Sequence, residues 1–466
     1  MQTKKTKLLL SIGSFAVLST AVAQSVTIES VLGVAKSMGA FDIEAHPNLE
    51  KKEKDEADSI LKSAATMFHI QMATEKQSRD AHAKGHGCAV AEFEISNKVP
   101  TEYQVGVLSQ PGRTFDAIVR FSNGSGTTKA DGIPDGRGLA IKVLDGAANG
   151  NLLGTGTTQD FLLINGSRFF IRSAKDYALF NQIVAQDKKP DRFFLERAIR
   201  EALSEAGRSD SEDLSSETVI APMMPGVLQL AKDPSILQKT IATLFPQASA
   251  TEQQLIFGSL AKKAMAMTKA QAPLELKIAA ALARPIGSAV TESYHSMASY
   301  LLKSGISAKR DTAVKYSARP VDCQTRAQLQ PEAPIDNLPE NGLRLDLGAK
   351  LASGERCFDF FIQPLPENLD QLAKVKLVED PRLDYGTPEI LVASLKLPVQ
   401  NFDTPEKQKA CEDLSFNPWQ ADPAHRPLGA LNRARKAAVT ASSIRRHFVT
   451  GAERVEPTTL EILKNK

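Results

Sequence analysis

The sequence predicts an α+β fold: an antiparallel β-barrel core, interrupted by a helical insertion and followed by C-terminal helices. Three observations predict it. Over residues 88–172, apolar and polar residues alternate with a period of two, which is typical of strands. Over 173–300, apolar residues recur at helical spacing. Strand patterns then return, and the chain closes with a helix; these elements cover 312–319, 357–363, 390–397 and 431–447.

The strand patterns before residue 172 are short and separated by turn residues. Within 117–122, Arg120 and Ser122 share a face because side chains alternate along a strand. Asn165 ends the pattern over 161–165, on the face of Phe161 and Leu163. Short strands at this spacing predict an antiparallel barrel or sandwich.

The helical patterns divide the remainder of the chain. Residues 51–80 form a helical pattern ahead of the strands, and the insertion carries several more in segments rich in Ala, Lys or Glu. We expect a signal peptide over 1–23, an N-terminal helical arm over 24–87 and the first half of the barrel over 88–185. The helical insertion then covers 186–290, the second half of the barrel 291–365, and a C-terminal strand and helical region 366–466.

The first residues resemble a secretory signal. Three lysines precede the apolar run 8–18, and Ala21-Val-Ala23 is a small-x-small cleavage pattern. Cleavage there would reduce the 57 basic residues to 54, equal to the 54 acidic ones. We therefore expect a periplasmic or secreted protein with no membrane span in its mature form and no basic face for nucleic acid.

Four cysteines are present: Cys88, Cys323, Cys357 and Cys411. Export permits disulfides, and four cysteines allow three pairings, between which the sequence does not choose. Buried free thiols with a single bridge are an equally acceptable interpretation.

His82 lies where the helical pattern gives way to the strands, next to Gly85 and Gly87. A histidine at such a junction could act as a general acid or base near neutral pH. It could also be a structural loop residue, or form a zinc site with His86 and Cys88. No GxSxG, GxGxxG or Walker pattern occurs, which argues against a serine hydrolase or a nucleotide-binding protein.

Four segments together resemble catalases in order and spacing. They are Arg79-x-x-His82-Ala-Lys-Gly, Arg120-Phe-Ser122, Asp135-Gly-Arg-Gly-Leu-Ala-Ile-Lys142 and Asn165-x-x-x-Phe-Phe170-Ile-Arg172. Three later segments resemble the divergent catalase-like, haem-binding branch of that superfamily: 411–419, 425–429 and 432–436.

The resemblance implies a haem, expected to be b-type, and a peroxide substrate. In catalases a distal histidine moves a proton of hydrogen peroxide, an asparagine orients the peroxide, and a serine hydrogen-bonds the histidine. By position, His82, Asn165 and Ser122 would take these roles. Proton transfer of this kind contributes about 10²–10⁴ in rate.

The resemblance also assigns residues that would hold the haem. Arg79 and Arg120 would bind its propionates, and Phe170 would pack on its distal face. Arg435 and Arg446, on the final helix, are candidates for the cationic side of the proximal face.

The proximal ligand departs from the catalase pattern. Catalases ligate iron with a tyrosine that follows an arginine by one helical turn, but the residue four after Arg435 is Val439. A second placement leads to Ala421. Neither side chain can ligate iron, so the metal ligand stays unknown and haem occupancy is in doubt.

These observations lead to three hypotheses. The first is a haem-dependent catalase or peroxidase acting on hydrogen peroxide outside the cytoplasm. The second is a haem enzyme converting organic or fatty-acid hydroperoxides, as allene oxide synthases of this fold do. The third is a degenerate, haem-poor binding protein. The expected partner is a small peroxide, and a homo-oligomer is left open because catalases are commonly tetramers.

Overall fold

A computed structural model describes residues 27–72, 79, 81–185, 191–208, 216–266, 274–302, 311–335, 338–454 and 456–464. The predicted signal peptide, residues 1–23, lies outside these ranges.

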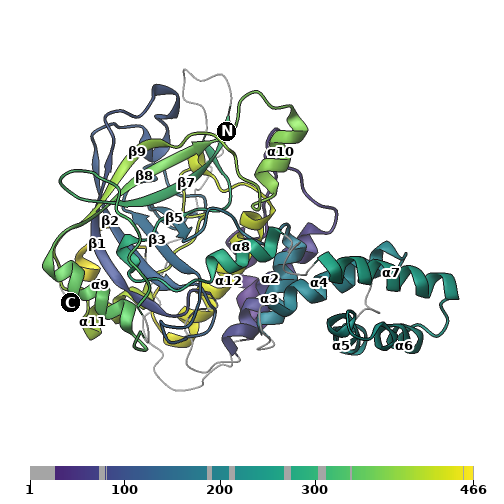
Figure 1. Cartoon of the computed structure of the whole chain (residues 1–466). Helices are drawn as coiled ribbons and strands as arrows, with labels where there is room; N and C mark the ends of the chain where they lie inside the picture. The colour runs from purple at the N-terminus through teal and green to yellow at the C-terminus, as the bar shows by residue number, and fades with distance from the viewer. Residues whose placement is uncertain are drawn as a thin grey trace, which may run out of the picture.

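The described residues form a closed antiparallel barrel (Figure 1). The strands run in the order β5-β4-β3-β2-β1-β9-β8-β7, and β5 also pairs with β7, which closes a ring of eight; β6 adds to β7. The α+β prediction with an antiparallel barrel is therefore confirmed. The strands are β1 Gly85–Ile95, β2 Thr114–Asn123, β3 Arg137–Val143, β4 Gln159–Ile164, β5 Tyr294–His295, β6 Tyr300–Leu302, β7 Thr312–Val321, β8 Arg356–Pro364 and β9 Ile390–Leu397.

The barrel interior is an aromatic and aliphatic core. Phe93, Phe161, Tyr316 and Phe360 meet there at ring-centroid distances of 4.8–5.9 Å. The alternation along β2 places Phe121 in this core, so its neighbours in the strand face the outside of the barrel. That outer face is buried too, because other segments cover it.

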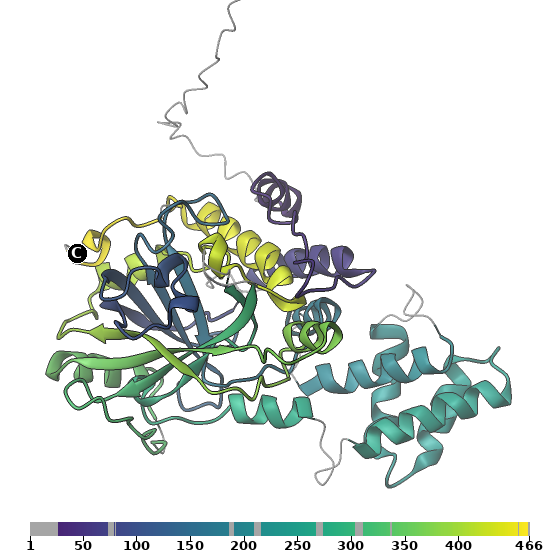
Figure 2. The same ribbon diagram turned by 90° about the horizontal axis from the view of Figure 1, so that it is seen from above.

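Helices pack against the barrel on more than one side, and some extend away from it (Figure 1). In both views α2, α3 and α12 lie together beside the barrel, and α4 to α7 form a projection (Figures 1 and 2). The helices are α1 Ile28–Ser37, α2 Glu56–Met72, α3 Ala174–Ala185, α4 Asp191–Glu205, α5 Ala221–Gln229, α6 Pro234–Leu244, α7 Ala250–Ala266, α8 Leu274–Leu282, α9 Gly342–Ser353, α10 Gln371–Glu379, α11 Pro405–Asp413, α12 Ala430–Thr450 and α13 Glu461–Lys464. The short turns are 3₁₀ helices η1 Thr101–Tyr103, η2 Gly106–Leu108, η5 Ala289–Thr291 and η6 Pro423–His425, and the π-helical turn η3 Ser216–Ile220.

A buried arginine fixes α12 in place. The fully buried Arg433 donates from Nε and Nη2 to the Glu56 carboxylate at 2.7 and 2.8 Å. It also pairs with Glu50 and Glu379. Those two carboxylates in turn accept the backbone N–H groups of Gly429 and Ala430, both at 2.7 Å. One cation thus joins the start of α12 to the N-terminal arm and to α10.

The four cysteines form two disulfides. Cys88 of β1 is bonded to Cys411 of α11, and Cys323 is bonded to Cys357 of β8. The interpretation with free thiols is wrong. Among the described residues, no helix combines the length and the apolar character needed to cross a bilayer.

Candidate functional site

The backbone at His82 is held in a left-handed conformation, with φ of 54°. Its N–H donates to the Gly124 carbonyl at 3.2 Å, and its own carbonyl accepts from Arg120 Nη2 at 3.0 Å. A non-glycine residue with positive φ is uncommon and persists where its surroundings fix it. Such strain is often found at functional sites. The surrounding hydrogen bonds therefore fix this histidine in an unusual backbone conformation.

Ser122 orients the imidazole of His82. Nδ1 of His82 lies 3.0 Å from the Ser122 hydroxyl, which projects from the outer face of β2. The ring lies against Gly138 of β3, where an added Cβ would come within 2.5 Å of Nδ1. The close approach of the ring therefore requires glycine at this position. The sequence prediction had placed His82 and Ser122 together, and the geometry does so.

The surroundings keep His82 neutral. Burial lowers its pKa, and the nearby cations Arg120, Arg435 and Arg79 lower it further, to about 3. A neutral imidazole has one ring nitrogen that donates and one that accepts a proton. Near pH 7 His82 is therefore a proton acceptor held in one orientation.

Asn165 lies beside the same strand. Its Oδ1 accepts the backbone N–H of Arg137 at 2.8 Å, and its Nδ2 donates to the Leu282 carbonyl at 3.4 Å. An added Cβ on Gly136 would lie 4.0 Å from Oδ1. Asn165 therefore lies at the start of β3, and His82 lies against Gly138, one residue into the same strand. Nδ2 carries two hydrogens and the Leu282 carbonyl accepts one of them, so the second is available to orient a small ligand.

Phe170 packs in an aromatic cluster between the barrel and the helices. Its ring centroid lies 4.6–6.1 Å from those of Phe169, Phe180, Phe193 and Phe194. It is only partly buried, so one part of the ring stays available to a ligand.

Three arginines from distant segments meet at the end of α11; we call Arg79, Arg120 and Arg446 the arginine cluster. Arg79 Nε and Arg120 Nη2 donate to the carboxylate of Glu412 at 3.0 and 3.1 Å. Arg446 donates to the Glu412 carbonyl and, at 3.0 Å, to the Leu414 carbonyl. The residues predicted to hold haem propionates are thus brought together, around a carboxylate of the chain itself.

Sequence reasoning missed Glu412. Partial burial raises its pKa, but Arg120 and Arg79 outweigh that effect and hold it at about 2. An added Cβ on Gly85 would lie 2.8 Å from both Arg120 Nη2 and Glu412 Oε1, so this glycine makes room for the pair. The only signal in the sequence was an acidic residue directly after Cys411.

The partly exposed face of α12 carries the predicted proximal position. From Ala430 to His447, Arg435 and Val439 are the residues that are not buried, and they lie one turn apart on one face. Val439 offers no ligand atom. Ala421, the other placement, is fully buried. Burial raises the pKa of the Tyr300 phenol, while the neighbouring Arg435 lowers it.

These residues fit a haem on one side. The oriented His82 and the arginine cluster suit a distal face and propionate groups, and the buried Nε of Arg120 has no hydrogen-bond partner among the described residues. The proximal position Val439 does not supply a ligand. The described residues therefore suit the distal face and the propionates of a haem, but the expected position of the axial ligand holds no side chain that can bind iron.

Two of the three candidate zinc ligands, Cys88 and His86, have other partners in the structure. Cys88 is bonded to Cys411, and Nε2 of His86 lies 3.0 Å from the Asn123 amide oxygen. Across the described ranges, no group of three His, Cys, Asp or Glu side chains is placed to hold a metal ion.

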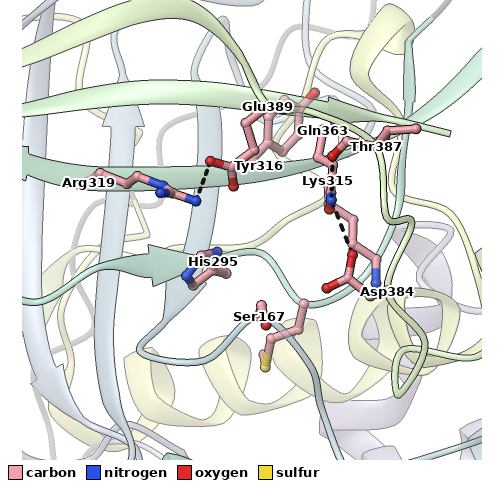
Figure 3. Close-up of a pocket in the computed structure, with 10 residues that line it drawn as sticks. Ser167, His295, Lys315, Tyr316, Arg319, Gln363, Asp384, Thr387 and Glu389 are labelled. Carbon is pink, nitrogen blue, oxygen red and sulfur yellow. Dashed lines mark hydrogen bonds and ion pairs between the residues drawn. The ribbon is translucent and has the colours of Figure 1, made fainter.

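A pocket of about 490 Å³ opens elsewhere, against β7 and β8 (Figure 3). Arg319 and Glu389 form an ion pair at 2.5 Å on one side of it, and Asp384 lies on the other. His295 and Ser167 face them. Neither His82 nor the arginine cluster lines this pocket, so it is separate from the candidate site.

Comparisons with known proteins agree with the resemblance drawn from the motifs. Residues 55–199 match the family model for catalases. A search of curated protein sequences finds no similar protein.

Among solved structures, the chain is similar to a fungal catalase, with 15% identity, coverage of 84% of this chain and 65% of that one, and a TM-score of 0.45. For catalase A from Saccharomyces cerevisiae the values are 13%, 87%, 68% and 0.46. For a bacterial catalase they are 14%, 88%, 64% and 0.43. The chain therefore spans only about two thirds of the length of these catalases.

Proposed function

We propose, from the match of residues 55–199 to the family model for catalases, that this chain is a haem-dependent, catalase-like or peroxidase-like protein that handles hydrogen peroxide. The observation that carries the proposal is the His82–Ser122 pair: a neutral imidazole in a strained, fixed position, 3.0 Å from the hydroxyl that orients it. Such a group is suited to general acid–base catalysis.

The chain's own residues would act as follows. When Nδ1 of His82 carries its proton toward the Ser122 hydroxyl, Nε2 is left as the acceptor for a peroxide proton. Because the His82 pKa is about 3, the imidazolium would be short-lived and would return the proton to the departing oxygen. The free amide hydrogen of Asn165 would orient the peroxide. Haem, when bound, supplies the two-electron chemistry.

The haem would be held chiefly through its carboxylates. The arginine cluster supplies guanidinium groups suited to paired, charge-assisted hydrogen bonds. Phe170 supplies an aromatic surface on the distal side. The absence of a ligand atom at Val439 predicts weaker haem binding and slower dismutation than an axial phenolate would give.

The proposal is tested on the mature protein incubated with haemin. A Soret band that co-purifies with the protein, and oxygen evolution from hydrogen peroxide, are the expected results. His82→Asn should lower the turnover number by about 10²–10⁴. His46→Asn is the matched control, because His46 pairs with Asp311, away from the site. Equal turnover in the two variants would refute the role of His82.

A second candidate is a haem-poor binding protein of the same fold. Two observations favour it: Val439 offers no axial ligand, and Glu412 occupies the arginine cluster. It predicts no Soret band with haemin. Replacing hydrogen peroxide with cumene hydroperoxide in the same assay separates dismutation from the conversion of organic hydroperoxides.

We further propose that the protein works in the periplasm or is secreted. The two disulfides support this, because such bonds persist in oxidising compartments. The signal-like pattern over residues 1–23 supports it as well. Expression with and without residues 1–23, followed by fractionation, tests it: recovery of both forms in the cytoplasm would contradict export.

A further inference from the structure

Among the described residues, the arginine cluster holds more positive than negative charge. The side-chain carboxylate of Glu412 binds two of its three guanidinium groups, those of Arg79 and Arg120, while Arg446 binds the Glu412 backbone carbonyl. The next acid along α11, Asp413, pairs with Lys409 at 2.6 Å and acts on Arg446 through charge alone, without an ion pair to it. Backbone carbonyls at the end of α11 supply only partial charges. The cluster therefore has capacity for one more anion.

The buried arginine shows where that anion would bind. The Arg120 side chain is 4% exposed, and its Nε has no hydrogen-bond partner among the described residues. Burying an unsatisfied donor of a charged group is costly, so such a group usually has a partner. Burial and the neighbouring Arg79 both lower the pKa of Arg120, to about 10, which indicates a cation short of negative charge.

Glu412 is more exposed to solvent than the two arginines that bind its carboxylate. Its side chain is 33% exposed, whereas those of Arg79 and Arg120 are 11% and 4% exposed. A ligand carboxylate that approaches the arginines would therefore compete with the Glu412 carboxylate for the same hydrogen-bond donors.

A disulfide keeps Glu412 at this position. The preceding residue, Cys411, is bonded to Cys88 of β1, and Cys88 lies directly across from Arg120 in the sheet. The covalent link and the strand pairing together place Glu412 beside Arg120. The carboxylate is thus a fixed part of the cluster.

We infer that Glu412 is a specificity-determining residue whose carboxylate takes the place of one ligand carboxylate in the arginine cluster. The wild-type chain consequently binds a tetrapyrrole dicarboxylate more weakly than the cluster alone would, and favours a ligand that presents one carboxylate. The identity of the ligand in this inference rests on the proposed haem function. The presence of an anion site rests on the arginine cluster alone.

The test measures binding rather than turnover. Haemin and haemin dimethyl ester are titrated against the full-length mature wild type, Glu412→Gln and Glu406→Gln, with affinity taken from the absorbance change. Glu406→Gln is the matched control, because it makes the same substitution at an exposed position in the first turn of the same helix. We expect Glu412→Gln to bind haemin about tenfold more tightly, which corresponds to about 1.4 kcal/mol. Binding of the ester, and all binding by Glu406→Gln, should be unchanged.

Equal or weaker haemin binding by Glu412→Gln would overturn the inference and leave the haem function standing. If neither protein binds haemin, the haem function fails, and sulfate decides the inference separately. A larger rise in melting temperature with sulfate for Glu412→Gln than for wild type supports an anion site that Glu412 fills; an equal rise overturns it. Should Glu412→Gln not fold, Glu412→Asp withdraws the carboxylate by one methylene and is expected to strengthen haemin binding less.

Discussion

Replacing Arg433 by methionine should strongly destabilise the fold. The side chain is fully buried and contacts the carboxylates of Glu50, Glu56 and Glu379, two of which are themselves almost fully buried. Its removal leaves carboxylates without their cation. Breaking a buried ion pair by removing one partner costs about 3–5 kcal/mol. We expect at least that loss in the free energy of unfolding, because burial raises the pKa of Glu379 and Arg433 opposes that rise.

Fluorescence of Trp419 provides the assay. It is the chain's only tryptophan, and its indole Nε1 donates to the Asn432 carbonyl of α12 at 2.8 Å. Guanidinium unfolding followed at this residue therefore reports the detachment of the helix that carries Arg435 and Val439. Arg435→Met is the matched control: the same substitution, on the same helix, at a partly exposed position.

A double-mutant cycle isolates the pairwise interaction. Glu56→Gln should be destabilising in the wild type and much less so, or even stabilising, in Arg433→Met, with a coupling of about 0.5–3 kcal/mol. A loss below about 1 kcal/mol for Arg433→Met would refute the reasoning, since the network would then not hold α12 in place.

Three further predictions concern pH, haem and the disulfide. The folded-state pKa of His82, about 3, is below its ordinary value of 6.5, so the stability that this group contributes is present above pH 6.5 and is lost as the pH falls toward 3. In that window, His82→Asn should lower the slope of the unfolding free energy against pH by up to about 1.4 kcal/mol per pH unit. An unchanged slope would contradict the pKa shift. Val439→Tyr should bind haemin about tenfold more tightly than Val439→Phe, or about 1.4 kcal/mol, judged by the Soret band; equal binding would mean that Val439 is not the proximal position. Replacing Cys88 and Cys411 together by serine should cost about 2–5 kcal/mol in guanidinium unfolding, and a negligible change would show that other contacts suffice to hold α11.

The sequence predicted those parts of the site that follow from local periodicity. The two-residue spacing of Arg120 and Ser122 places both on one face of a strand, and the structure confirms that placement on β2. The final helix, expected over 431–447, extends over Ala430–Thr450. These features depend on backbone geometry, which a short segment already determines.

Features that depend on distant segments were beyond prediction. Glu412 reaches the arginine cluster because a disulfide joins α11 to a strand 323 residues earlier, and the sequence could not choose that pairing. The remaining exposure of Val439 likewise depends on what covers the other faces of α12. Such facts arise from packing between elements and have no local pattern.

The Cys88–Cys411 bond has a consequence for how the molecule responds to proteolysis. It closes a covalent ring that contains eight of the nine described strands in full, β2 to β9, and the entire helical projection. A single cut in the projection would open the ring without releasing either part, so the two pieces would migrate together on a gel until the bond was reduced. The projecting helices can therefore be cleaved, or replaced by an inserted domain, while the residues around His82 stay covalently joined to α11.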